Sequence, residues 1–166
     1  MAIRNLTNFN DPLFRKTSKP VVKFDDKLWT LLDDMRDTLE KVKGYGCAAV
    51  HVGILRRVVV VLDKTGASDK TGATGKSDAP NNAGVIELIN PSILEASAET
   101  ERVLEGSIAP DAPRGYVERP CKVVVSALNR HGEPITVAGE GFLAATFCHE
   151  IDHLDGILFT DKVRER

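Results

Sequence analysis

The amino-acid sequence predicts an α+β fold, because apolar runs typical of strands follow one another while only two segments show convincing helical periodicity. Strands and helices do not alternate regularly, which disfavours a doubly wound parallel sheet. The length of 166 residues suits one domain spanning residues 1–166. With 42% hydrophobic and 28% charged residues, the composition is that of a folded globular protein.

The first helix is expected from about Asp26 to Lys43. Asp25 or Asp26 can cap its N-terminus, and Gly44 follows as a stop signal. Apolar side chains recur at three- and four-residue steps and so form one buried face: Leu28, Leu31, Leu32, Met35, Leu39 and Val42.

Two apolar runs, Arg57–Leu62 and Val85–Asn90, predict buried strands, the second of them closed by Pro91. The segment between them, Asp63–Asn82, is rich in turn-forming residues and repeats the letters DKTGA. It lacks apolar anchors, so we expect a mobile surface loop inserted in a hairpin.

Two further strands are expected at Lys122–Leu128 and Pro134–Val137, joined by a hairpin turn at residues 129–132. The last helix is expected to begin near Glu140 or Gly141 and to end at Gly156. Its apolar residues form a buried stripe: Leu143, Phe147, Ile151 and Leu154.

Charge and hydropathy exclude several classes of protein. A net charge of −2 and a pI of about 6.1 disfavour nucleic-acid binding through bulk positive charge. No apolar run approaches the roughly 20 residues of a membrane span, and residues 1–10 lack the apolar region of a secretory signal. Three widely spaced cysteines, Cys47, Cys121 and Cys148, do not form a disulfide framework and favour the reducing cytoplasm.

The strongest functional signal is His149-Glu150-Ile151-Asp152-His153, within the last predicted helix. Two histidines four residues apart project from one helical face, so both rings can reach one metal ion. Glu150 lies one residue from His149, where it can border the ion and act as general acid and base.

A catalytic metal usually has three protein ligands and an open position for water. The remaining candidates are His51, His131, the carboxylates and the cysteines. Cys148 precedes His149 directly and so points to another face, and His131 lies in a predicted turn. The segment Gly44–Ala49 fits the dinucleotide pattern G-x-G-x-x-A, but it follows a helix instead of a strand, so nucleotide binding is not expected.

The sequence resembles the peptide deformylases, whose three motifs have counterparts here in the same order. These are residues 44–53 (GYGCAAVHVG), 105–109 (EGSIA) and 148–156 (CHEIDHLDG). The resemblance continues through residues 11–12, 88–91, 114–115, 119–120 and 139–141. It covers nearly the whole chain apart from the loop at residues 63–82.

The resemblance implies a peptide-deformylase-like fold, with antiparallel sheets around a central metal-binding helix. It implies hydrolysis of the formyl group from the N-terminal formylmethionine of nascent peptides, and so a role beside the ribosome. The family usually holds a divalent metal, often Fe²⁺, with Zn²⁺, Ni²⁺ or Co²⁺ as substitutes, which polarises the attacking water.

The resemblance also assigns roles to residues. His149 and His153 would be metal ligands, with Ser107 at the position of the third. Glu150 would shuttle the proton, and the backbone N–H of Ile108 would help to stabilise the oxyanion. The peptide would be bound by residues around the cleft: Gly44, Tyr45, Gly46, Val103, Glu105, Phe142, Ala145 and Thr146.

Departures from the family pattern cluster in the first two motifs. Where the family has a cysteine ligand, this chain has Ser107, whose neutral hydroxyl is a weak ligand, so metal binding is expected to be weaker. His51 stands where the family has a glutamine that contacts the oxyanion or the attacking water, and Ala109 replaces a serine. Ala145 stands where many relatives carry a larger side chain, which predicts a wider pocket.

Two interpretations remain open. In one, the protein is a deformylase by descent with reduced activity, or an inactive member that still binds peptide N-termini. In the other, His51 replaces the missing thiolate, which gives a site of three histidines with His149 and His153.

Overall fold

The computed structural model describes residues 2–64, 69–71 and 84–164. Its elements, in chain order, are η1 (Pro12–Arg15), α1 (Asp26–Lys41), β1 (Gly46–Ala48), η2 (Ala49–Val52), β2 (Val58–Leu62), β3 (Asp69–Thr71), β4 (Val85–Ala96), β5 (Thr100–Glu105), β6 (Gly115–Pro120), β7 (Lys122–Leu128), β8 (Pro134–Glu140), α2 (Phe142–Leu154) and η3 (Phe159–Asp161).

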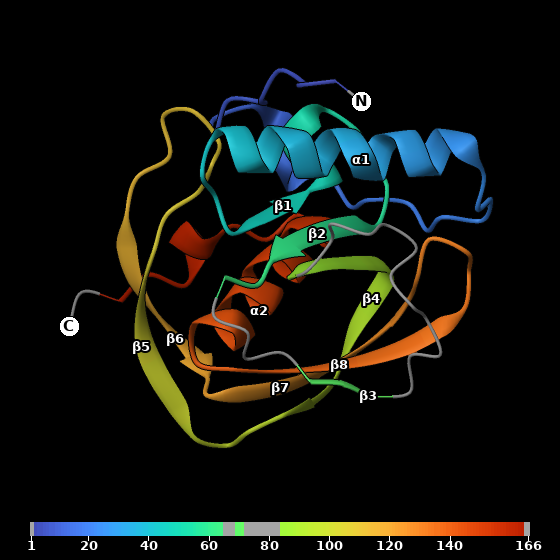
Figure 1. The fold of residues 1–166 in the computed structure, drawn as a ribbon. Helices are drawn as coiled ribbons and strands as arrows, with labels where there is room; N and C mark the ends of the chain where they lie inside the picture. The colour runs from blue at the N-terminus through green and yellow to red at the C-terminus, as the bar shows by residue number, and fades with distance from the viewer. Residues whose placement is uncertain (1, 65–68, 72–83, 165–166) are drawn as a thin grey trace.

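In the described residues the strands form two antiparallel sheets, one in the order β1-β2-β4-β7-β8-β3 and the other a β5-β6 pair. Figure 1 shows α2 in the centre of the molecule, with strands around it, and α1 on the outer side of β1 and β2. The predicted α+β class is confirmed. No helix in the described part of the chain is long and apolar enough to cross a membrane.

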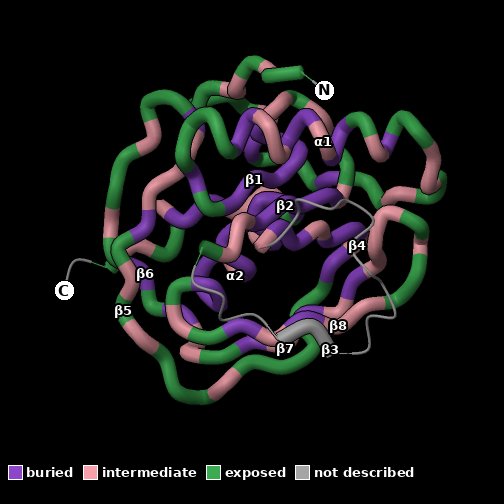
Figure 2. Tube along the Cα trace, in the orientation of Figure 1, coloured by how far each residue is buried: buried purple, intermediate pink, exposed green. Residues whose placement is uncertain are grey.

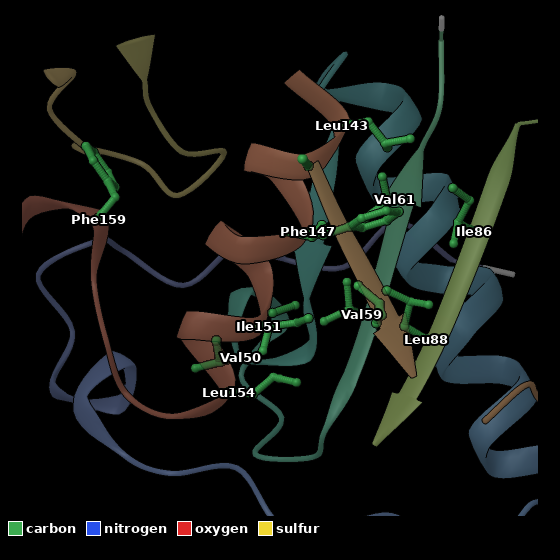
Figure 3. Close-up of a cluster of buried hydrophobic side chains, with 14 of the residues drawn as sticks. Val50, Val59, Val61, Ile86, Leu88, Leu143, Phe147, Ile151, Leu154 and Phe159 are labelled. Atoms are coloured by element: carbon green, nitrogen blue, oxygen red, sulfur yellow. The ribbon is translucent and has the colours of Figure 1, made fainter. Parts of the chain in front are cut away.

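The strands β1, β2 and β4 separate two hydrophobic cores. Successive side chains of a strand point to opposite faces, and all four valines of β2 are fully buried. Val59 and Val61 therefore pack toward α2, with residues of β4 and α2 (Figure 3): Ile86, Leu88, Leu143, Phe147, Ile151 and Leu154. The predicted apolar stripe of α2 thus packs against the sheet and holds the segment His149–His153 in place.

The other face of the same strands packs against α1. Val58 and Val60 of β2 belong to this second core, together with residues of α1: Leu28, Leu31, Leu32, Met35 and Leu39. Figure 2 shows the result, in which β1, β2 and α2 are buried while much of β5 is exposed. A strand covered on both faces needs a continuous apolar sequence, which is why Val58–Val61 shows no alternation.

The predicted helix near the N-terminus is confirmed as α1, and its cap is Asp25, whose carboxylate accepts a hydrogen bond from the N–H of Leu28 at 3.2 Å. It ends at Lys41 instead of Lys43, because Lys43 takes a positive φ of 56°. The hairpin at residues 129–132 is confirmed, with Gly132 at φ 80°. The final helix is shorter than predicted and begins after Gly141, at Phe142.

The strand predicted at Val85–Asn90 needs correction. β4 does not end before Pro91 but continues to Ala96. The register with β7 shifts between Ile89 and Ser92, and Asn90 has a φ of 50°. This bulge takes Pro91, which has no N–H to donate, out of the regular ladder.

The predicted loop at residues 63–82 contains a short strand, β3, which pairs with β8. The rest of that prediction, including mobility, falls on residues 65–68 and 72–82, which lie outside the described residues. The strands β1, β5 and β6 were not predicted. β1 has only three residues, and β5 alternates polar and apolar side chains along a largely exposed pair of strands.

Candidate metal centre and active site

Three segments far apart in the sequence bring the predicted catalytic residues together. The helix α2 carries His149, Glu150 and His153. The 3-10 turn η2, directly after β1, carries His51. Ser107 follows the end of β5. The three histidines and Glu150 are all buried, with exposed fractions of 7% or less.

The pair His149 and His153 has the geometry of a metal site. Their Nε2 atoms lie 3.2 Å apart. Nδ1 of His149 faces a carboxylate oxygen of Glu105 at 2.7 Å, so it carries the proton and leaves the Nε2 lone pair free to bind a cation. Because metal–nitrogen bonds are about 2.0–2.1 Å long, two nitrogens at this spacing can bind the same ion. The pair therefore fits a divalent metal.

A buried ion-pair network holds His149 from behind. Arg119 donates to both carboxylate oxygens of Glu105, at 2.6 and 2.9 Å, and to the carboxylate of Asp152 at 2.8 Å. These bonds hold the pKa of Glu105 at about 2 although burial opposes ionisation. Glu105 therefore fixes the tautomer of His149, and the carboxylates of Glu150 and Glu105 together raise the pKa of His149 against the effect of burial.

His51 is oriented by the backbone of its own turn. The N–H of Ala48 donates to Nδ1 at 3.0 Å, and burial lowers the pKa of the ring to about 3. A neutral imidazole that accepts at Nδ1 carries its proton on Nε2. Nδ1 also lies 3.2 Å from the backbone oxygen of Ala48, but the N–H of Ala48 makes the shorter contact. With the proton on Nε2, His51 donates to the hydroxyl oxygen of Ser107, 3.3 Å away.

The hydroxyl of Ser107 also accepts a hydrogen bond from the N–H of Ala109, at 3.1 Å. A hydroxyl oxygen has two lone pairs, and these two donors take both of them. In this arrangement Ser107 has its proton left to offer, and no lone pair for a metal.

Glu150 lies beside these groups and is buried, with an exposed fraction of 4%. Its pKa is raised to about 7, chiefly by burial. Its Oε1 has no hydrogen-bond partner within the described residues and lies 3.9 Å from Nδ1 of His51. A Cβ on Gly46 would lie 2.7 Å from Oε2 of Glu150, so only glycine allows the backbone to approach this closely.

A second set of possible ligands lies close by. One ligand atom each from His51, Glu150 and His153 lie within 4.8 Å of one another. His149 does not belong to that group, so the structure brings His51 and His149 each close to His153 but does not place the three histidines around one point. His131 lies elsewhere, exposed on the β7–β8 hairpin with its ring against Trp29.

A cavity of about 740 Å³ opens next to these residues. Ser107, Ile108, His149 and Glu150 line it, together with seven of the predicted peptide-binding residues: Gly44, Tyr45, Gly46, Glu105, Phe142, Ala145 and Thr146. The eighth, Val103 on β5, does not line it. Glu105 reaches the lining, but its carboxylate is taken by Arg119 and His149 and is not free for a peptide.

Comparison with known sequences identifies the family. The sequence profile of the polypeptide deformylases matches residues 3–166. This chain belongs to the polypeptide deformylase family. Peptide deformylase of Acetivibrio thermocellus is 46% identical over 163 residues, covering 98% of this chain and 85% of that protein. Peptide deformylase 2 of Clostridium acetobutylicum is 46% identical over 166 residues, covering 99% and 98%.

Solved deformylase structures share the fold. Peptide deformylase from Thermotoga maritima matches with a TM-score of 0.84 and 32% identity, covering 99% of each chain. The enzyme from Synechococcus elongatus, solved in complex with actinonin, matches with a TM-score of 0.81 and 31% identity, covering 98% of this chain and 80% of that one. The expected deformylase-like fold is therefore confirmed.

Within this deformylase fold, sequence reasoning missed the network of Glu105, Arg119 and Asp152. The only sequence signal at Arg119 was its place in a segment that resembles the family, and the only one at Asp152 was its place between the two histidines. Arg119 and Glu105 lie 14 residues apart on β6 and β5 without being directly opposite in the register. The one available signal was the acidic Asp152 on the helix that carries the metal motif, because a carboxylate there needs a partner when half-buried.

Proposed function

We propose that this protein is a peptide deformylase, a metal-dependent hydrolase that removes the formyl group from the N-terminal formylmethionine of nascent peptides. Family membership over nearly the whole chain supports this activity. The observation that carries the mechanism is the convergence of Nε2 of His149 and His153, 3.2 Å apart, where His149 and the buried Glu150 line one cavity.

His149 and His153 are the residues that would hold the metal, Fe²⁺ or Zn²⁺, with Ni²⁺ or Co²⁺ as substitutes. When bound, a divalent cation supplies Lewis-acid polarisation of the formyl oxygen and lowers the pKa of the attacking water. The missing thiolate and the occupied lone pairs of Ser107 leave two imidazoles as the protein ligands, so we propose weak metal binding.

Glu150 moves the proton. Hydrolysis forms a bond between water oxygen and the formyl carbon, breaks the C–N bond, and yields formate and a free amine. The carboxylate of Glu150 accepts the proton that the water loses and delivers it to the departing nitrogen. A pKa near 7, raised by burial, suits a group that must both take and give a proton at neutral pH.

His51 and Ile108 provide hydrogen-bond donors for the oxygen that gains negative charge. The Nε2–H of His51, oriented by Ala48, donates to the Ser107 hydroxyl in the absence of substrate, so it must leave that hydroxyl to reach the substrate oxygen. Ile108 lines the cavity next to Ser107, where its backbone N–H can donate to the substrate oxygen that gains negative charge. A backbone donor such as the N–H of Ile108 is fixed before the reaction and needs no reorganisation in the transition state.

The partner in this proposal is an N-formylated peptide emerging from the ribosome, which places the protein in the cytoplasm. The free cysteines Cys47, Cys121 and Cys148 fit that reducing compartment. The alternative of an inactive peptide-binding protein is not favoured, because the relatives that match over nearly the full chain are named peptide deformylases.

The test is release of formate from formyl-Met-Ala by protein loaded with Fe²⁺ under anaerobic conditions, or with Ni²⁺ in air. We expect saturable turnover that chelation removes and metal restores. Glu150→Gln keeps the shape of the side chain but cannot accept the proton, so it should retain metal and lose turnover. A metal-loaded protein that releases no more formate than Glu150→Gln would contradict the proposed function.

A further inference from the structure

The exposed charged residues that line the cavity are both basic. Lys43 and Arg114 line the cavity and are exposed. The other ionised side chains of the lining, Glu105 and Glu150, are buried, with exposed fractions of 6% and 4%. Glu105 is in addition neutralised by Arg119. A ligand that extends from the metal toward solvent therefore meets cations and no exposed carboxylate of the lining.

The two cations stand on different walls of the cavity. Lys43 directly precedes Gly44–Gly46, which lead into β1. Arg114 lies on the opposite segment, between β5 and β6, and its side chain packs over Gly106, with Cγ and Nε 3.6 and 3.8 Å from the place of a Cβ there. Gly106 precedes Ser107, so the arginine side chain lies close to the segment that carries Ser107.

Neither cation forms an ion pair with another described residue, that is, within residues 2–64, 69–71 and 84–164. A third cation adds to the same side, because Nζ of Lys64 lies 3.4 Å from the backbone oxygen of Lys43 and 4.3 Å from the ring centroid of Tyr45.

An aromatic pair accompanies these cations at the mouth. The rings of Tyr45 and Phe142 meet edge to face with centroids 4.8 Å apart, and 45% and 44% of these residues are exposed. Both residues line the cavity, as does the half-exposed Leu104. An extended peptide advances about 3.3 Å per residue, so the two residues after methionine would pass this apolar platform and reach the cations.

We propose that Lys43 and Arg114 determine substrate specificity, and that the protein prefers formylmethionyl peptides with an acidic side chain at the second or third position. This inference rests on the proposed deformylase function and names its substrate class. Attraction between partly exposed charges is modest and screened by salt, so the preference is expected to be moderate and to depend on ionic strength.

The experiment compares two peptide series, formyl-Met-Ala-Xaa and formyl-Met-Xaa-Ala, with Xaa as Asp, Asn or Lys. In at least one series we expect kcat/KM for Asp to exceed that for Asn by about fivefold at low ionic strength. At about 0.5 M salt the ratio should fall below about twofold, because the Debye length is then only a few ångströms. Equal kcat/KM for Asp, Asn and Lys in both series at low salt would overturn the specificity.

Charge reversal identifies the residues responsible. Arg114→Glu and Lys43→Glu should each reduce or reverse the preference for Asp over Lys. Lys23→Glu, an exposed position that does not line the cavity, makes the same change in net charge and serves as the control. A preference that survives in both cavity variants, or that Lys23→Glu reduces equally, would contradict the assignment. Because the two cavity variants are independent, misfolding of one leaves the other informative.

Binding of product peptides separates this inference from the proposed function. Calorimetry with the metal-loaded protein measures Met-Ala-Asp, Met-Ala-Asn and Met-Ala-Lys, which carry no formyl group. Tighter binding of the acidic peptide without any formate release would overturn deformylase activity and leave the charge preference standing. Formate release with no dependence on peptide charge would support deformylase activity and overturn the charge preference.

Discussion

Nε2 of His51 lies 3.3 Å from the hydroxyl oxygen of Ser107, so two of the residues interpreted above as departures from the deformylase motifs are in direct contact. A third departure, Ala109, donates its N–H to the same oxygen at 3.1 Å. The altered residues thus form one hydrogen-bonded group beside the metal-binding histidines. Their substitutions should have coupled, non-additive effects.

Replacing Ser107 by cysteine should strengthen metal binding. A thiolate is a far better ligand for Fe²⁺ or Zn²⁺ than a neutral hydroxyl, and His51 and Ala109 can still donate to the sulfur. We expect Ser107→Cys to raise metal affinity by about tenfold or more in competition with a chelator. Loading with Co²⁺ should also produce a sulfur-to-metal charge-transfer band in the near ultraviolet. Ser107→Ala is the matched control, and equal affinities in all three proteins would show that position 107 does not face the ion.

Variants of His51 distinguish a hydrogen-bond donor from a metal ligand. If Nε2–H serves the developing oxyanion, His51→Gln retains metal and most of the activity, because its amide offers an N–H at similar reach. His51→Ala should then retain metal while kcat falls by about 10²–10³-fold. Metal content is measured on both purified variants. Loss of the ion from His51→Gln would instead support the alternative in which His51 replaces the thiolate.

Glu105 should control metal affinity without touching the ion. Its carboxylate accepts from Nδ1 of His149 at 2.7 Å and fixes Nε2 as the ligand atom. Glu105→Gln keeps the shape of the side chain but weakens this bond and leaves Arg119 less well compensated. We expect metal affinity to fall by about 10–100-fold. Urea unfolding of the metal-free proteins serves as the control. An unchanged metal affinity would show that Glu105 does not control metal binding through His149.

Gly46 should be essential for the placement of Glu150. A methyl group at this position would lie 2.7 Å from Oε2 and 2.8 Å from Cγ of Glu150, and 2.9 Å from Cγ2 of Thr146. Gly46→Ala must therefore displace the carboxylate. We expect kcat to fall by about 10²-fold while metal content stays the same, because the atoms nearest to this methyl group belong to Glu150 and Thr146 and not to the histidines. Full activity in Gly46→Ala would mean that the position of Glu150 is not critical.

The buried carboxylate of Asp34 should make stability depend on pH. It accepts from the N–H of Ala2 at 2.6 Å and from Nε of Arg4 at 2.9 Å. Burial disfavours its ionisation, but these bonds prevail and hold its pKa below the usual range. A lowered pKa stabilises the fold above the unfolded-state value of about 3.9, and this contribution is lost as pH falls through the folded-state value.

Asp34→Asn should therefore lower the free energy of unfolding by about 1–2 kcal/mol at pH 7. The difference from the unchanged protein should shrink below about pH 4. Asp37→Asn, which loses only a partly exposed pair with Arg36, should cost less than about 0.5 kcal/mol. Urea unfolding at several pH values measures both, and a difference at Asp34 that grows in acid would contradict the sign.

The sequence was most informative where periodicity and chemistry coincide. The apolar stripe of α2 predicted the helix, and the spacing of His149 and His153 predicted that their rings lie close together. Pairings made by tertiary contacts were not predictable in the same way. The tautomer of His51 depends on the N–H of Ala48 in a strand of three residues, and the anion behind His149 depends on an arginine from another strand. Pro91 was misleading because a bulge at Asn90 accommodates it.

The central claim is that His149 and His153 hold a catalytic ion in a deformylase site that has no thiolate ligand. Anomalous diffraction from crystals loaded with Ni²⁺, recorded on both sides of the metal absorption edge, tests it most directly. We expect one metal peak within bonding distance of Nε2 of both histidines, with Ser107 outside the coordination sphere. A metal bound elsewhere in the molecule, or no peak at the two histidines in loaded crystals, would contradict it.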